Sequence, residues 1–187
     1  KHENFIPIGA EQIPKSFDKQ TLIFTNRVSH LISPFLLTLF RTKAHIPVQD
    51  NLRYFPLNYI LRFFVMGPLV YSFGYKDDAL FNNIDTINSL LKTGKPVVSF
   101  LNKDFASRSS QDTIHIYQEV LELIRSDINI CFLNLPNFEH NNIATYANPN
   151  FITVKYQSKD DLFEGIDLSD DKLVLEQLVF FFNFRYC

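Results

Sequence analysis

Two short polar segments hold the residues of this 187-residue chain that are best suited to chemistry. They are Thr25–His30 and Val97–Lys103, and each follows or contains an apolar run that predicts a buried strand. A histidine such as His30 titrates near neutral pH and can act as a general base, and a loop cation such as Lys103 can hold an anion. The pattern is typical of functional loops at the ends of strands.

Neither nearby histidine has the setting of a catalytic base. A base of this kind needs a carboxylate that orients it, but Phe35 stands five residues after His30. We interpret His30 as a polar loop or surface histidine. His45 does have a carboxylate five residues later, Asp50, but this pair follows a predicted helix and has no flanking Asn or Ser. We interpret the His45–Asp50 pattern as a chance match, and keep His30, His45 and Asp50 as fallback catalytic candidates.

Strands and helices alternate along the chain. Strands are expected over Thr21–Thr25, His45–Val48, Leu69–Phe73, Pro96–Phe100, Ile128–Leu133 and Phe151–Tyr156. Helices are expected over Phe35–Phe40 (entered at Ser33-Pro34), Asn58–Val65, Asp77–Leu91 (stopped by Gly94), Thr113–Ser126 and Leu173–Phe182. The alternation predicts one α/β domain over residues 1–187, with a mostly parallel central sheet flanked by helices and an irregular lead-in over residues 1–20.

The strands and loops over about residues 20–156 resemble the PlsC-like glycerophospholipid acyltransferases, the lysophosphatidate acyltransferase family. Asn26, Ser29 and the Pro34-Phe35 helix entry are similar to that family's Asn-His-x-Ser-x-x-Asp-like loop. Thr93–Phe100 is similar to the Gly-x-x-Val-x-x-Phe strand that leads into its substrate-phosphate motif. The resemblance implies an acyltransferase-like fold and an acceptor hydroxyl that a histidine would deprotonate.

The residues that carry the family chemistry are replaced in the first loop. The base position is occupied by Arg27 and the carboxylate position by Ile32. Arginine stays protonated at physiological pH, and isoleucine cannot orient an imidazole. We therefore expect no catalytic residue in this loop, and treat Arg27 and Ile32 as degenerate motif positions.

The phosphate-binding positions have also changed. Leu101–Phe105 stands where the family has Pro-Glu-Gly-Thr-Arg, and Phe73 stands where an intermediate motif has arginine. Lys103 and Arg108 are the remaining substrate-binding candidates in this region. A plain alternative is that both are solvated loop charges.

The rest of the chain offers no replacement chemistry. It has no Gly-x-Ser-x-Gly elbow, P-loop or dinucleotide glycine pattern, so we expect no cofactor. Cys131 and Cys187 form no metal-ligand pair, and we expect no metal. The acidic pairs Asp77-Asp78, Asp160-Asp161 and Asp170-Asp171 are expected at helix starts, where they complement the helix dipole.

The composition of the chain excludes some classes of binding partner. The formal charge is −2 and basic residues form no stripe, so we expect no nucleic acid. The 20 phenylalanines favour a bulky core over lipid contact, and no apolar run is long enough for a transmembrane helix. The Phe-rich C-terminus (Phe180, Phe181, Phe182 and Phe184) is either an interface or core.

These observations predict a pseudoenzyme, a catalytically inactive acyltransferase-like protein. It would act as a structural or lipid-contacting subunit of a larger membrane-associated complex, inside the cell and in a mitochondrion for example. Its expected partners are protein subunits of that assembly and a phospholipid or peripheral membrane surface. Two alternatives remain open: a divergent acyltransferase that moves an acyl group from acyl-CoA to a lysophospholipid, and a lipid carrier or sensor that uses the old acyl groove.

Overall fold

The computed structural model describes the strands and helices around one central sheet. The described residues are 5–17, 20–27, 36, 39, 40, 44–49, 72–75, 84–102, 111–135 and 150–182. The predicted helix Asn58–Val65 lies outside these residues, as do the helix entry Ser33-Pro34 and the pair Asp77-Asp78. Leu36, Leu39 and Phe40 are helical, as predicted.

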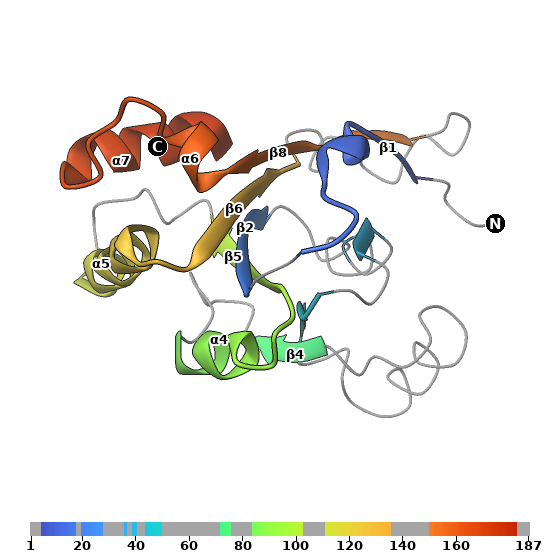
Figure 1. Ribbon diagram of the computed structural model, residues 1–187, viewed down its shortest axis with the longest axis horizontal. Coiled ribbons are helices and arrows are strands. Elements are labelled where there is room, and N and C mark those ends of the chain that lie inside the picture. The colour runs from blue at the N-terminus through green and yellow to red at the C-terminus, as the bar shows by residue number, and fades with distance from the viewer. Residues whose placement is uncertain are drawn as a thin grey trace.

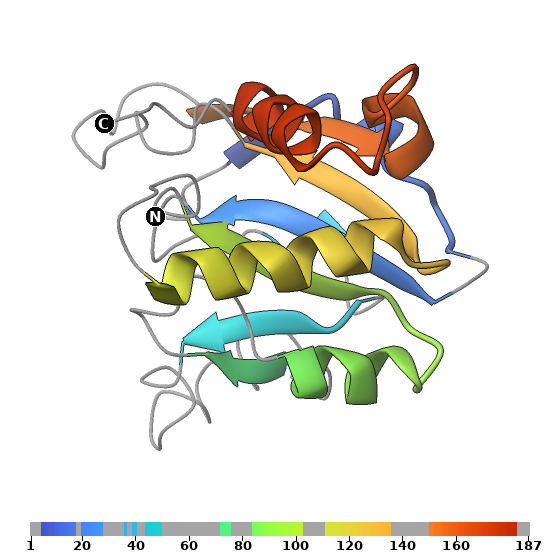
Figure 2. The ribbon, with the colours of Figure 1, turned by 90° about the vertical axis from the view of Figure 1, so that its left-hand side faces the viewer.

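The main sheet has four strands in the order β5-β2-β6-β8. Strands β5 (Val97–Asn102), β2 (Thr21–Arg27) and β6 (Asn129–Asn134) run parallel, and β8 (Lys155–Ser158) pairs antiparallel with β6. Figures 1 and 2 show β2 between β5 and β6. The predicted mostly parallel sheet with flanking helices is confirmed.

Two short parallel pairs extend this arrangement. Strand β3 (Ile46–Gln49) pairs with β4 (Ser72–Tyr75), and a single bridge from His45 to Val97 joins β3 to the β5 side of the sheet. Strand β1 (Phe5–Ile8) pairs with β7 (Asn150–Thr153).

Two expectations near these strands are wrong. The lead-in over residues 1–20 is not irregular throughout, because β1 and the 3₁₀ helix η1 (Ala10–Gln12) lie within it. The single strand expected over Phe151–Tyr156 is two strands, β7 and β8, which belong to different sheets. The chain changes partner at Val154, whose N–H donates to the Ile8 carbonyl at 2.8 Å. Pairing between distant segments decides where β1, β7 and β8 form, and the local sequence pattern does not contain that information.

Four described α-helices accompany the strands. They are α4 (Ile84–Leu91), α5 (Gln111–Arg125), α6 (Lys159–Leu162) and α7 (Asp171–Phe182). Helix α4 ends as predicted, because Gly94 has φ 78° and its N–H donates to the Leu91 carbonyl at 3.0 Å. Helix α6 was not predicted. Its first turn contains Asp160 and Asp161, while Asp170 accepts hydrogen bonds from the first N–H groups of α7, so these two acidic pairs lie at helix starts as expected.

The sheet separates two hydrophobic clusters. On one face, side chains of β2, β5 and β6 pack against α4, α5, α6 and α7, and Figure 2 shows α4, α5 and α7 on this same side. The strand residues of this face include Leu22, Phe24, Val97, Leu101, Ile130 and Phe132. The other face is covered by earlier parts of the chain, which include Ile13, Phe17, Leu36, Phe40 and Ala44. Because strand side chains alternate, β2 contributes to both clusters.

Phe132 is the centre of an aromatic group under α7. Its side chain is fully buried, and its ring lies 5.8 Å from Phe24 and 5.7 Å from Phe163, between ring centroids. Phe181 and Phe182 of α7 contact it edge-on at 6.2 and 6.3 Å. These contacts attach α7 to the middle of β6.

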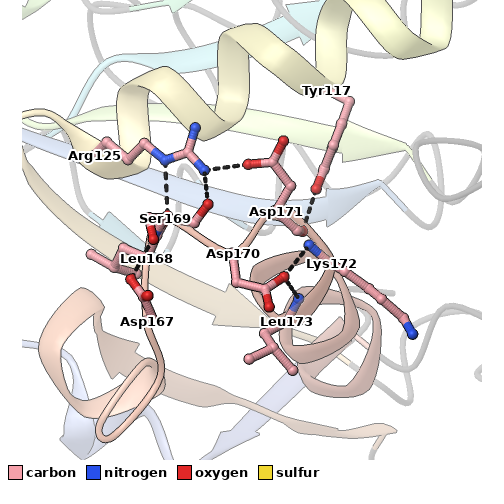
Figure 3. A network of polar contacts seen from close by, with 9 residues as sticks. All are labelled: Tyr117, Arg125, Asp167, Leu168, Ser169, Asp170, Asp171, Lys172 and Leu173. Atoms are coloured by element: carbon pink, nitrogen blue, oxygen red, sulfur yellow. Dashed lines mark hydrogen bonds and ion pairs between the residues drawn. The ribbon is translucent and has the colours of Figure 1, made fainter.

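A polar network holds the start of α7 against α5 (Figure 3). The Arg125 guanidinium donates to the Leu168 carbonyl at 2.8 Å and the Ser169 carbonyl at 3.3 Å, and also pairs with the Asp171 carboxylate. The Tyr117 hydroxyl donates to the Asp171 carbonyl. One arginine near the end of α5 therefore fixes the loop that enters α7.

Replacing Arg125 with Ala is expected to lower the free energy of unfolding by about 1–2 kcal/mol, because two hydrogen bonds to carbonyls and one ion pair are lost. The matched control is Lys172→Ala, which removes only an exposed pair to Glu176 at 3.9 Å and should cost less than about 0.5 kcal/mol. Urea unfolding of both variants measures the difference. Equal shifts would show that the Arg125 network contributes nothing beyond a surface charge pair.

Phe132→Ala is expected to cost about 3–5 kcal/mol, because it opens a cavity inside the aromatic group. Phe180→Ala is the control of the same residue type, since Phe180 is 81% exposed, and it should change stability by less than about 0.5 kcal/mol. Thermal or urea unfolding tests the pair. A large loss for Phe180→Ala would contradict the described packing of α7.

Candidate functional site

The carboxyl ends of β2 and β5 bring the two polar segments together. In the parallel register Asn26 lies beside Leu101, and Arg27 lies beside Asn102. Both strands point the same way in Figure 2, so the loops that follow them leave from one edge of the sheet. The residues of those loops, among them His30, Ile32, Lys103 and Arg108, lie outside the described residues.

The chain leaves these two strands for opposite faces of the sheet. After β2, Leu36 and Phe40 pack on the face that contains Ile23. After β5, Val120 and Ile124 of α5 pack on the face that contains Leu22. In open parallel sheets such a point, where consecutive connections diverge, is the usual position of a ligand crevice. The topology therefore makes this end of the sheet the candidate position for a site.

The polar side chains described at this edge serve the fold. Asn26 is buried, and its Oδ1 accepts a hydrogen bond from the Leu135 N–H at 3.0 Å. Asn134 is buried too, and its Nδ2 donates to the Phe181 carbonyl near the end of α7. Side-chain amides do not titrate near neutral pH, so neither asparagine can act as a general acid or base.

Among the described residues, two buried oxygens at the same edge have no hydrogen-bond partner. They are Oγ1 of Thr25 and Oδ1 of Asn134. Thr25 lies beside Leu133 in the β2–β6 pairing, and side-chain alternation directs it to the face opposite Asn26. The two oxygens therefore lie on different faces of the sheet and do not form one site.

His45 lies at the opposite edge of the sheet. Its backbone N–H donates to the Pro96 carbonyl at 2.7 Å, and its backbone carbonyl accepts from the Val98 N–H at 2.8 Å. These two bonds place His45 beside the start of β5. Five strand steps separate Val97 from Asn102, or about 17 Å. The structure does not bring His45 to the edge that holds Arg27 and Asn102.

The His45 imidazole has a structural partner. Its Nε2 lies 2.8 Å from Thr93 Oγ1, and the Thr93 hydroxyl donates to the Leu90 carbonyl at 2.7 Å. The threonine oxygen is therefore the acceptor, and His45 Nε2 carries the proton. Strand β3 (Ile46–Gln49) lies between His45 and Asp50 in the sequence, and Asp50 is outside the described residues.

A thiol–phenol pair is the polar contact that sequence reasoning missed. Cys131 and Tyr156, on the paired strands β6 and β8, share a hydrogen bond. Burial raises the pKa of the Cys131 thiol above 9.0, and the hydrogen bond offsets this only in part. Burial and the same hydrogen bond raise the pKa of Tyr156 well above 10.0. A protonated, buried thiol is a poor nucleophile, so the pair is structural.

The described residues contain no group of three or more His, Cys, Asp or Glu side chains that could hold a metal ion. Within the same residues, no helix has both the length and the apolar character needed to cross a membrane.

Comparison with known proteins gives no match to a family model, a curated protein or a solved structure.

The stability of the protein is expected to fall at alkaline pH in a way that depends on Tyr156. The folded state holds the protons of Cys131 and Tyr156 more tightly than the unfolded chain does, because both pKa values are raised. This contribution is complete below the ordinary pKa values of 9.0 and 10.0 and is lost as pH rises above them.

Urea unfolding near pH 8 and near pH 10.5 measures this loss, and Tyr156→Phe should reduce it because the phenol with the raised pKa is then absent. Wild type and Tyr156→Phe losing the same stability over this range would contradict the prediction.

Proposed function

We propose that this chain is a catalytically inactive domain of acyltransferase-like fold, which serves as a structural subunit of a larger intracellular, membrane-associated assembly. A mitochondrial complex is the first setting to examine. The proposal follows from strands that resemble those of the family, combined with motif positions that lack the catalytic residue types. Strands β2 and β5 present the two motif segments side by side, yet the base position is Arg27 and the carboxylate position is Ile32.

The observation that carries the proposal is the use of the described polar groups near this edge. Asn26, one of the residues that resembles the family loop, fixes the chain after β6 rather than facing a substrate. The one fallback histidine among the described residues, His45, lies about 17 Å along the strands and donates to Thr93. Proton transfer needs a titrating group within hydrogen-bond reach of the reacting hydroxyl, and neither residue supplies it.

The purified chain is expected to release CoA from acyl-CoA at the background rate, with lysophosphatidate as acceptor. His30→Gln and His45→Gln should leave that rate unchanged, because neither histidine serves as a base. An active acyltransferase in the same assay shows that the substrates are competent. Turnover well above background that disappears in either histidine variant would establish the divergent enzyme instead.

A second measurement addresses the subunit role directly. Sedimentation of the chain from its native source should place it in particles much larger than its own 21.9 kDa. Recovery as a free monomer under gentle extraction would count against the role. An acyl lipid that co-purifies in equal amount would favour a lipid carrier.

A further inference from the structure

Helix α7 turns an apolar surface toward solvent. Its inner face is buried against the sheet through Val174, Leu178 and Phe182. The opposite side carries Leu173, Glu176 and Phe180, spaced by three and four residues, which we call the α7 outer face. Phe180 is 81% exposed and Leu173 is 44% exposed. Among the described residues, the other exposed large hydrophobic side chain is Ile8, on β1.

The chain segment that contains helix α7 is strongly acidic. Residues 159–182 contain seven carboxylates and two lysines, a formal charge of −5, whereas the whole chain carries −2. All seven carboxylates are exposed: Asp160, Asp161, Glu164, Asp167, Asp170, Asp171 and Glu176.

Few cations among the described residues offset these carboxylates. Lys159 donates to the Ser126 carbonyl at 2.9 Å, and Lys172 pairs with Glu176 at 3.9 Å. Arg125 pairs with Asp171. Ser169 donates to Asp167 and holds the pKa of that carboxyl below 3.8, so its charge persists at neutral pH. Phe180 also lies in the last turn of α7, where the helix dipole adds negative potential.

We propose that the α7 outer face is a docking site for a basic amphipathic helix of a partner protein. The apolar side of that helix would cover Phe180 and Leu173, and its lysines and arginines would pair with Glu176 of the same face and with other exposed carboxylates of residues 159–182. This chemistry disfavours two other occupants. A second copy that met this face through its own α7 would set like charges against each other, and an anionic bilayer would be repelled. The inference rests on the proposed subunit role and specifies one surface of it.

The probe is a labelled helical peptide with a leucine face and a lysine face, titrated against the full chain by fluorescence anisotropy. We expect binding that weakens with added salt and that falls about tenfold in Phe180→Ser, because the apolar anchor is lost. Ile8→Ser is the matched control, since it removes an exposed apolar side chain on β1, and it should bind like wild type. Thermal unfolding confirms that both variants remain folded.

The proposal is overturned by equal binding to a peptide of leucine and glutamate, or by equal affinity of the Phe180→Ser and Ile8→Ser variants. It is also overturned if Phe180→Ser abolishes self-association, or abolishes flotation with phosphatidylserine vesicles, in place of peptide binding. These binding results do not change the outcome of the acyl-transfer assay, which tests the proposed function separately. A chain that is inactive and sediments in a large particle, but binds no basic peptide, would keep the subunit role and lose this docking site.

Discussion

The burial of strand β2 is the constraint on which the rest of the structure depends. Every residue from Thr21 to Asn26 is buried, so the backbone must be paired on both edges and the side chains covered on both faces. Strands β5 and β6 pair with the two sides of its backbone. Helices α4, α5 and α7 cover one face, and the segments around η1 and Phe40 cover the other. The elements that pack on these faces are therefore placed by their part in enclosing this strand.

The same constraint explains what the polar residues at the carboxyl edge do. Where the β2–β6 ladder ends, the Asn26 side chain replaces a backbone acceptor and holds the Leu135 N–H. Asn134 then reaches a carbonyl in the last turn of α7 and helps to satisfy a helix end. Buried amides in these positions favour one arrangement of the edge, because leaving them unpaired is costly. A parallel sheet usually offers this edge to ligands, and here part of it is used for internal bonding.

Helix α7 has one face buried against the sheet and the opposite face exposed to solvent. Its three consecutive phenylalanines have different environments, because successive residues differ by about 100° around a helix. Phe182 is buried, Phe181 is partly buried and packs on Phe132, and Phe180 is exposed. Arg125 at one end and Asn134 at the other attach the helix to the body of the domain. Helix α7 is therefore held at both of its ends, while the Phe180 side chain between them stays exposed.

The sequence by itself determined the strands β2, β3, β5 and β6, the helices α5 and α7, and the parallel character of the sheet, because hydrophobic period and helix-stop residues act locally. From the resemblance, it also predicts that Arg27 and Ile32 stand where the related enzymes have a base and a carboxylate. Only the tertiary structure decided the pairing of β1 with β7, the change of partner at Val154 and the position of His45 beside Pro96. Those features depend on which distant segments meet. The energy of such contacts comes from pairing and shared burial, which no short stretch of sequence contains.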